Sequence, residues 1–173
     1  GTLLSYIYDP DGTVLVTGDG RRWSPATTSV PEMFGATGGG LVDDTAALIA
    51  WMEYGGKMYA DGHYLVAAAG PDAGGAYARL LRSVDVSCGP NCRFIAGEGL
   101  DNDVLRWTAQ WSLYDPDNLL SIKWRGGLID QSGQSGQCNS TVIPNAATWP
   151  GARPGTSVTT DGLYLIGYVK DPA

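Results

Sequence analysis

The sequence predicts a mostly β protein built from short strands and tight turns. Its 173 residues include 25 glycines and ten prolines, and short apolar pieces alternate with Gly, Asp, Asn and Pro along most of the chain. A hydrophobic content of 43% is ample for the core of one globular domain. Strands this short suit either a β-sandwich or a parallel β-helix, and propensity alone does not separate the two.

Charge and composition argue against several partners. The net charge is −7, and Arg21 and Arg22 form the only adjacent basic pair, whereas phosphate binding relies on clustered Lys and Arg. No apolar run approaches the roughly 18 residues of a membrane-spanning helix. His63 is the only histidine, so no Cys/His metal spacing exists. We therefore expect no nucleic-acid partner, no membrane insertion, no metal and no cofactor.

Residues 1–30 are expected to form a separate arm and linker. In "TVLVTGDGRRW" (residues 13–23), a β-branched run and an Arg-Trp end surround two glycines, which predicts a hairpin turning at residues 18–20. The following "SPATTSVPEM" contains Pro25 and Pro31 and continues neither a ladder nor a helix, so we expect an extended connector.

Residues 31–56 are expected to form a capping segment with one short helix. Three glycines at 38–40 allow a left-handed backbone path, and Asp43 or Asp44 supplies a carboxylate for the unpaired N–H groups of a helix start. Residues 45–54 should be helical, and the glycines at 55 and 56 end the helix. Residues 46–52 are all apolar, so the helix should be covered on more than one side.

Residues 57–173 hold the remaining strand candidates. "GKMYADGHYLVAA" indicates a strand, an Asp-Gly turn and a second strand, and "SVDVSCGPNCRFIAGEG" repeats that order. Further apolar pieces are "VLRW", "LLSIKW", "GLID", "STVI" and "LYLIGYV".

A longer pattern separates the two fold classes. Residues 34–66, "FGATGGGLVDDTAALIAWMEYGGKMYADGHYLV", resemble the opening of the right-handed parallel β-helix proteins of the pectate lyase and polygalacturonase-like superfamily, in which Phe-Gly-Ala-x-Gly-Asp-Gly precedes Asp-Asp-Thr and a short helix. Upstream, "DGTVLVTGDGRRW" and "VPEMFGA" look like the segment before this motif in bacteriophage tailspikes and tail fibres. The double resemblance covers about residues 12–66. This chain departs from the pattern at Gly39, where the family has Asp, and at Asp61, where the family has Pro.

The resemblance implies a mostly β, right-handed parallel β-helix with a short N-terminal capping α-helix and a leading hairpin arm. At roughly 20 to 30 residues per coil, residues 57–173 would hold the first four or five coils of a longer protein. The motif would close the end of the coil stack and perform no chemistry. We assign this structural role to six residues: Gly35, Gly38, Gly40, Asp43, Asp44 and Thr45.

Acid–base chemistry on a sugar needs carboxyl groups in one groove. Asp130 ends the piece "GLID", the kind of strand that carries functional acids in the superfamily, although a strand-end Asp is also a common solvated residue. It is our one candidate catalytic acid. Asp101, Asp103, Asp115 and Asp117 lie in stretches rich in turn residues, and "DPDN" and "DPDG" favour turns over calcium sites.

Four aromatic residues concentrate within 18 positions and are candidates for stacking on sugar rings: Trp107, Trp111, Tyr114 and Trp124. Packing between strands or chains explains them equally well in physical terms, and we favour it. Cys88 and Cys92 flank "CGPNC", a turn tight enough for a bridge, yet two free thiols fit the same spacing, and Cys138 has no evident partner.

Three functions follow from the resemblance. The first is a homotrimeric phage tailspike or tail fibre, located in the virion tail, that recognises a bacterial surface polysaccharide, contacts other tail proteins through its arm, and as a full-length depolymerase cuts the polysaccharide. The second is a secreted bacterial polysaccharide lyase or glycoside hydrolase. The third is a purely structural tail protein.

Overall fold

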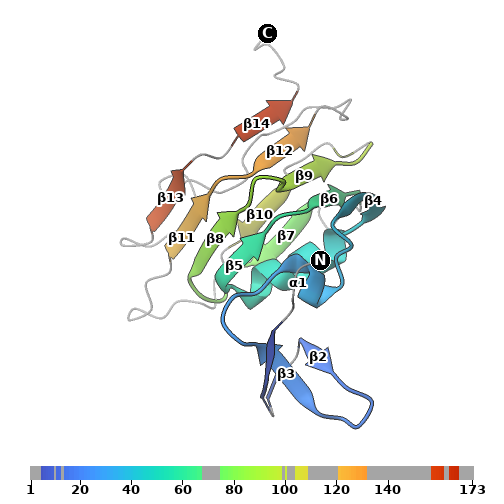
Figure 1. Cartoon of the computed structure of the whole chain (residues 1–173). Helices are drawn as coiled ribbons and strands as arrows, with labels where there is room; N and C mark the ends of the chain where they lie inside the picture. The colour runs from blue at the N-terminus through green and yellow to red at the C-terminus, as the bar shows by residue number, and fades with distance from the viewer. Residues whose placement is uncertain are drawn as a thin grey trace.

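The part of the chain that the structure describes is mostly β, with parallel sheets and one short α-helix (Figure 1). The computed structural model describes residues 5–9, 11–12, 14–67, 75–98, 100, 104–108, 121–131, 157–161 and 164–167. Within these residues no helix has the length and apolar character needed to cross a membrane.

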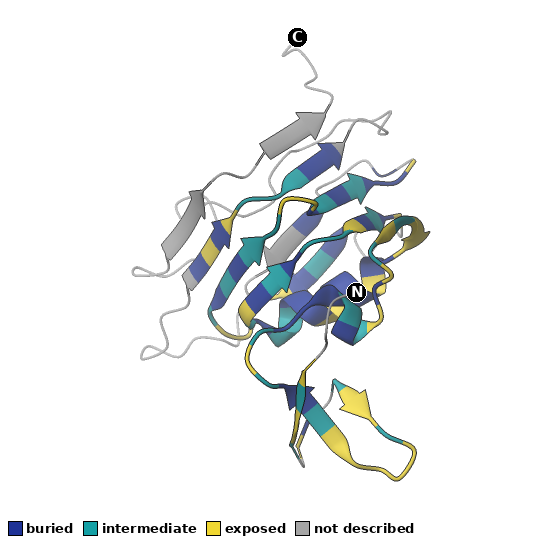
Figure 2. Cartoon of the chain, viewed as in Figure 1, coloured by how far each residue is buried: buried dark blue, intermediate teal, exposed yellow. Residues whose placement is uncertain are grey.

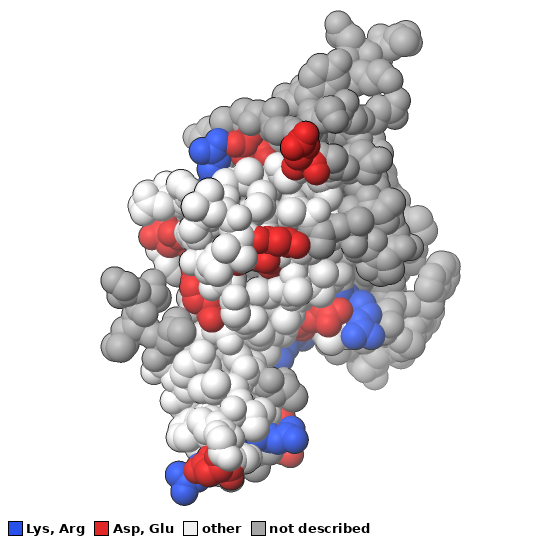
Figure 3. Space-filling model, turned by 90° about the vertical axis from the view of Figure 1, so that its right-hand side faces the viewer, with Lys and Arg blue, Asp and Glu red and all other residues white. Residues whose placement is uncertain are grey.

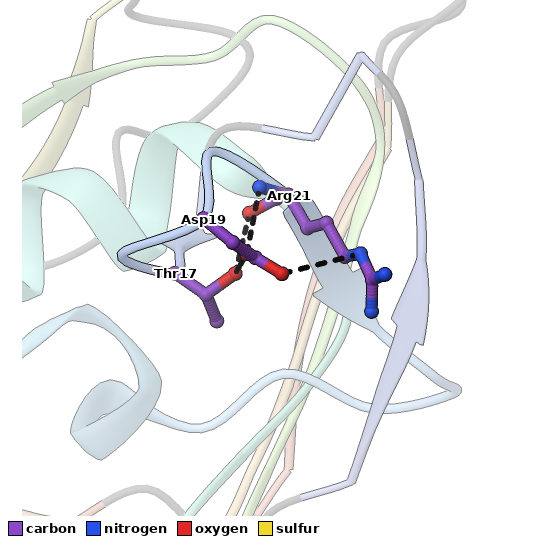
Figure 4. A network of polar contacts seen from close by, with 3 residues as sticks. All are labelled: Thr17, Asp19 and Arg21. Carbon is purple, nitrogen blue, oxygen red and sulfur yellow. Dashed lines mark hydrogen bonds and ion pairs between the residues drawn. The ribbon is translucent and has the colours of Figure 1, made fainter.

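The arm is a small antiparallel sheet in the order β1-β3-β2. Its strands are β1 (Tyr6–Tyr8), β2 (Leu15–Val16) and β3 (Arg22–Pro25). The predicted hairpin is confirmed, because β2 pairs with β3 and the Gly20 amide donates to the Thr17 carbonyl over 2.8 Å. At its tip, the Thr17 hydroxyl donates to Asp19 Oδ1 over 2.5 Å (Figure 4). Strand β1 was not predicted, and it pairs with the other side of β3.

In the body, the described strands form three parallel sheets. The first has the order β13-β11-β8-β5, the second β14-β12-β9-β6-β4, and the third pairs β10 with β7. The strands are β4 (Gly39–Asp43), β5 (Gly56–Ala60), β6 (His63–Val66), β7 (Ala76–Arg79), β8 (Val84–Cys88), β9 (Arg93–Ala96), β10 (Leu105–Thr108), β11 (Ser121–Arg125), β12 (Leu128–Gln131), β13 (Ser157–Asp161) and β14 (Tyr164–Gly167).

Parallel pairing distinguishes this body from an antiparallel sandwich. Every ladder between the described strands of the body is parallel. Strands β5 and β6 flank the predicted turn at residues 61–62 but belong to different sheets, and β5 pairs with β8, which lies further along the chain. A sandwich of antiparallel sheets is therefore wrong for the described part of the body. Hairpins join antiparallel neighbours, whereas the parallel neighbours seen here need long crossover connections.

Residues 31–56 contain a short 3-10 helix, η1 (Pro31–Phe34), and an α-helix, α1 (Thr45–Tyr54). The predicted helix bounds are confirmed. The helix packs against η1 and β7, and Leu48, Trp51 and Met52 are buried. Ala46 and Ala50 are exposed and Ile49 is only partly buried, so the helix is covered on several sides but not all round.

The connector was predicted to continue neither a ladder nor a helix, and this is wrong at both of its ends. Ser24 and Pro25 belong to β3 and pair with β1, and η1 begins at Pro31.

The residues between these ends also join the first sheet. Ser29 forms an isolated parallel bridge with Met58. Its amide donates to the Lys57 carbonyl over 3.0 Å, and its carbonyl accepts from the Tyr59 amide over 2.9 Å. The same carbonyl accepts from the Trp51 indole over 3.3 Å. The connector thus links the arm to β5 and to α1.

The core lies between the sheets, where inward-facing positions alternate with outward-facing ones (Figure 2). An aromatic stack runs through it. Tyr64 on β6 stacks on Phe94 of β9 at a centroid distance of 5.4 Å, and Phe94 meets Trp124 of β11 edge-on at 5.8 Å. Such ring contacts add about 0.5–1.5 kcal/mol each beyond the area they bury.

Candidate functional site

The two aspartates of the capping motif bind different partners. Asp44 is buried, and its Oδ1 accepts the Thr37 amide over 2.7 Å while its own amide donates to the Leu65 carbonyl over 2.8 Å. Asp43 Oδ1 accepts the Thr45 amide over 3.0 Å and the Ala67 amide over 3.2 Å. Both carboxylates therefore hold backbone in place.

This arrangement differs in detail from the sequence expectation. At the start of α1, the Asp43 carboxylate reaches the first helical amide, that of Thr45, and the Thr45 hydroxyl donates to the same oxygen over 2.5 Å. Asp44 occupies the N-cap position but makes no side-chain hydrogen bond to the helix. Its carboxylate points instead at the start of the glycine loop, residues 37–40, where it accepts hydrogen bonds from the Thr37 amide and hydroxyl.

The glycines of the motif have two kinds of environment. Gly35, Gly38 and Gly40 have φ angles of 99°, 65° and 72°, the left-handed region that favours glycine. A Cβ at Gly40 would also lie 3.1 Å from the His63 Cβ. At Gly39 φ is not positive, and no atom of the described residues would come within 4 Å of a Cβ.

Asp130 lies on β12 with a side chain that is 5% exposed. Nη2 of Arg93, on the neighbouring strand β9, donates to Asp130 Oδ2. The carboxylate is thus bound by a guanidinium and almost closed to solvent. The geometry favours a structural ion pair at this position.

The aromatic candidates are only partly described. Trp124 is fully buried, and its indole donates to the Gly126 carbonyl over 2.8 Å, so neither ring face is open to a sugar in this arrangement. Trp107 belongs to β10, but its side chain lies outside the described residues. Several further candidates lie outside them entirely: Asp101, Asp103, Trp111, Tyr114, Asp115, Asp117 and Cys138.

A groove of about 590 Å³ crosses the outer face of the first sheet beside the connector. Its polar floor comes from alternate positions of three strands: Lys57 and Tyr59 on β5, Asp85 and Ser87 on β8, and Arg125 on β11. Residues from the connector and from the start of the arm line it as well, among them Ser5, Thr27 and Thr28.

The floor of the groove is held by a charge network. Arg125 Nη2 donates to Asp85 Oδ1 over 2.5 Å and to Ser87 Oγ over 2.9 Å. In the register of the sheet, Lys57 stands opposite Asp85, and Tyr59 stands opposite Ser87. The groove thus presents charges, hydroxyls and one aromatic ring, and Val30, Met33 and Met58 add apolar atoms to its lining.

This floor was missed by the sequence reasoning. Its residues are spread over positions 57 to 125 and share no motif, and only the parallel register brings them together. The available signal was the alternation of polar and apolar residues in "GKMYA" and "VDVSC", which marks one outward face per strand.

Such a groove is chemically suited to a polar ligand with many hydroxyl groups. Its volume lies within the range of about 300–1,000 Å³ that is common for small-ligand sites. Charged and hydroxyl side chains on its floor offer both donors and acceptors. His63, the lone histidine, is exposed on β6 in the second sheet and takes no part in this groove.

Comparisons with family models, with curated proteins and with solved structures found no match to this chain. The site is therefore interpreted from its own residues.

Proposed function

We propose that this chain is a component of a phage tailspike or tail fibre, built on a right-handed parallel β-helix, that binds bacterial surface polysaccharide. Three parallel sheets support this architecture, because β5, β8, β11 and β13 succeed one another in one sheet while β6, β9, β12 and β14 do so in the next. Each round of chain adds one strand to both sheets. The helix α1 covers buried side chains beside β7, as an end cap would.

The observation that carries the binding proposal is the groove on the first sheet. A polysaccharide chain needs an elongated polar surface, and stacked parallel strands repeat the same outward positions in every round. Lys57, Asp85 and Arg125 provide charge there, and the Tyr59 ring offers an apolar face. The charged floor favours a polysaccharide that carries charged or strongly polar substituents.

We further propose that the chain is a homotrimer and that the arm contacts other tail proteins. Ile7, Tyr8 and Val16 are exposed on the arm. In Figure 3 the arm surface is largely uncharged, with charged atoms gathered toward its lower end. On α1 the exposed positions are the small residues Ala46 and Ala50, which would allow close approach of a second copy.

A purely structural tail protein is the second candidate, and the Asp130–Arg93 ion pair favours it. Our one candidate catalytic acid is engaged by a cation, so the residues described here support binding better than cleavage. We accordingly place any depolymerase activity of the full-length protein outside the described residues.

Polysaccharide binding is tested by calorimetry with purified surface polysaccharides from candidate host bacteria. The Lys57→Ala variant should raise Kd by about tenfold, which corresponds to about 1.4 kcal/mol. The matched control is Arg79→Ala, which removes an exposed cation from β7 in the third sheet and should change Kd by less than about twofold. An equal loss in both variants would point to charge in general rather than to the groove.

Light scattering coupled to size exclusion tests the assembly. A stable trimer that binds polysaccharide supports the tailspike proposal, and a trimer that binds none of the polysaccharides supports the structural tail protein. A monomer that binds and cleaves polysaccharide would instead favour a secreted enzyme.

A further inference from the structure

A short connection, here called a corner, links each strand of the first sheet to the next strand in the second sheet. The corner between β8 and β9 is longer than the corners between β5 and β6 and between β11 and β12. Two residues, 61 and 62, separate β5 from β6, and two residues, 126 and 127, separate β11 from β12. Between β8 and β9 there are four, residues 89–92. Cys88 and Cys92 stand at the two ends of this longer corner.

Hydrogen bonds hold the long corner in a defined shape, and two of them are made to residues at the corner between β5 and β6. The Cys92 amide donates to the Gly89 carbonyl over 3.1 Å, which closes a β-turn. The Gly89 amide donates to the Ala60 carbonyl over 2.8 Å, and the Asn91 amide donates to Asp61 Oδ1 over 2.8 Å. Hydrogen bonds therefore hold the two ends of the long corner together without a covalent link.

The sulfur atoms of Cys88 and Cys92 both lie close to Gly127, in the corner between β11 and β12. A Cβ built on Gly127 would lie 2.9 Å from the Cys88 Sγ and 3.6 Å from the Cys92 Sγ. Gly127 has a φ of 87°, so glycine is favoured there on backbone grounds too. The missing side chain leaves room for the two sulfurs, which are both free thiols in this structure.

A pocket of about 450 Å³ opens beside the pair and gives a reagent access to it. The two cysteines form part of its wall, and the rest is supplied by glycines, Pro90 and Leu128. Cys88 is half-buried, whereas Cys92 is 3% exposed. A small reagent in this pocket would reach Cys88 first.

We propose that Cys88 and Cys92 form an oxidation site. This dithiol exchanges with a small aliphatic disulfide and becomes an internal disulfide that joins the two ends of the long corner.

The exchange has two steps. The Cys88 thiolate attacks one sulfur of the reagent RSSR, a mixed disulfide forms on Cys88, and RS⁻ leaves and takes up a proton. The Cys92 sulfur, after its proton passes to solvent, then attacks the Cys88 sulfur and releases the second RS⁻, which is protonated in turn. Two thiols lose two electrons and two protons, and RSSR becomes two RSH.

The environment of Cys92 agrees with this order. Its hydrogen bond with Cys88, followed by burial, raises the pKa of the Cys92 thiol well above its usual range. Cys92 therefore remains protonated while Cys88 reacts. Conversion of Cys88 to a mixed disulfide removes that hydrogen bond, so the second step becomes easier once the first is complete.

The test uses the full chain with Cys138→Ser as background, so that only the two cysteines at 88 and 92 react. The protein is incubated under native conditions in buffers of oxidised and reduced glutathione, alkylated and digested with trypsin. Peptide 83–93, released by cleavage after Arg82 and Arg93, carries both cysteines. We expect it to lose two hydrogens and resist alkylation, and dithiothreitol should reverse the change.

Two single variants test the order of reaction. Cys92→Ser should keep glutathione on Cys88 as a stable mixed disulfide, whereas Cys88→Ser should remain unmodified in the folded protein. The oxidised protein should melt about 4 to 8 °C above the reduced one, because a cross-link restricts the unfolded chain.

Three results would overturn the proposal. They are a reaction that stops at the mixed disulfide when both cysteines are present, a disulfide that forms only in urea, and equal alkylation of both thiols before and after oxidation. Because none of these readouts involves polysaccharide or the arm, failure here leaves the proposed function untouched.

Discussion

The Tyr64 hydroxyl donates a hydrogen bond to Glu32 Oε1 over 2.8 Å. Tyr64 is fully buried on β6, and Glu32 belongs to η1 in the capping segment. A Cβ at Gly38 would lie 2.9 Å from the same oxygen, so the glycine loop leaves space for this contact. The bond joins η1 to the aromatic stack of the core.

We expect Tyr64→Phe to lower the free energy of unfolding by about 1.5 to 3 kcal/mol, because a charged acceptor loses its buried donor. The ring stacking on Phe94 would be retained. Urea denaturation followed by tryptophan fluorescence measures the change. Tyr8→Phe, at an exposed ring on the arm, should stay within about 0.5 kcal/mol. Equal stability of the two variants would show that the hydrogen bond contributes nothing net.

Alkaline pH should weaken the same contact. Burial, with the hydrogen bond to Glu32 as the next cause, raises the pKa of Tyr64 above its ordinary value. A raised folded-state pKa gives stability that is fully present below the unfolded pKa of about 10 and is lost as pH rises above it. Denaturation midpoints between pH 8 and 11 should fall more steeply for the wild type than for Tyr64→Phe. Parallel curves would contradict this assignment.

Asp44→Ala should lower the free energy of unfolding by about 1.5 to 3 kcal/mol, because the Thr37 amide and hydroxyl lose the buried Asp44 carboxylate as their acceptor. Asp11→Ala removes an exposed carboxylate from the arm and serves as the control, with an expected change within about 0.5 kcal/mol. Thermal and urea denaturation measure both variants. Unchanged stability in Asp44→Ala would argue against a structural role for the double aspartate.

Gly40 and Gly39 offer a matched pair of neighbouring substitutions. Gly40→Ala should cost about 1 to 3 kcal/mol, because a side chain there adopts left-handed backbone and crowds His63. Gly39→Ala should stay within about 0.5 kcal/mol, since the position is exposed and open. Denaturant unfolding distinguishes them, and a reversed order of stability would contradict the backbone geometry.

Asp19 at the arm tip should titrate below an ordinary aspartate. The Thr17 hydroxyl, followed by the Arg21 amide, holds the pKa of Asp19 below its usual range (Figure 4). A depressed folded pKa means that this contribution is present above the unfolded pKa of about 3.9 and is lost as pH falls. Carboxyl carbon NMR should show a higher midpoint in Thr17→Val than in the wild type. Identical midpoints would exclude the hydroxyl as the cause.

Local signals in the sequence were sufficient for several elements. The helix bounds of α1 followed from an apolar run between two aspartates and two glycines, and the hairpin of the arm followed from glycines in a β-branched stretch. Strand β1 and η1 were missed, because three or four residues carry too little periodicity to be separated from a turn.

The sequence by itself determined where its one described α-helix begins and ends, where the arm hairpin turns, and that its strands are short, because turn propensity, capping and apolar patterning act between near neighbours. Tertiary structure alone decided which strands pair and therefore what lies together. Lys57, Asp85 and Arg125 share a groove floor, and Cys88 and Cys92 share a pocket with Gly127, because parallel pairing aligns residues that lie far apart in the chain. The partner in such a ladder is set by the packing of the whole core, which no short stretch of sequence contains.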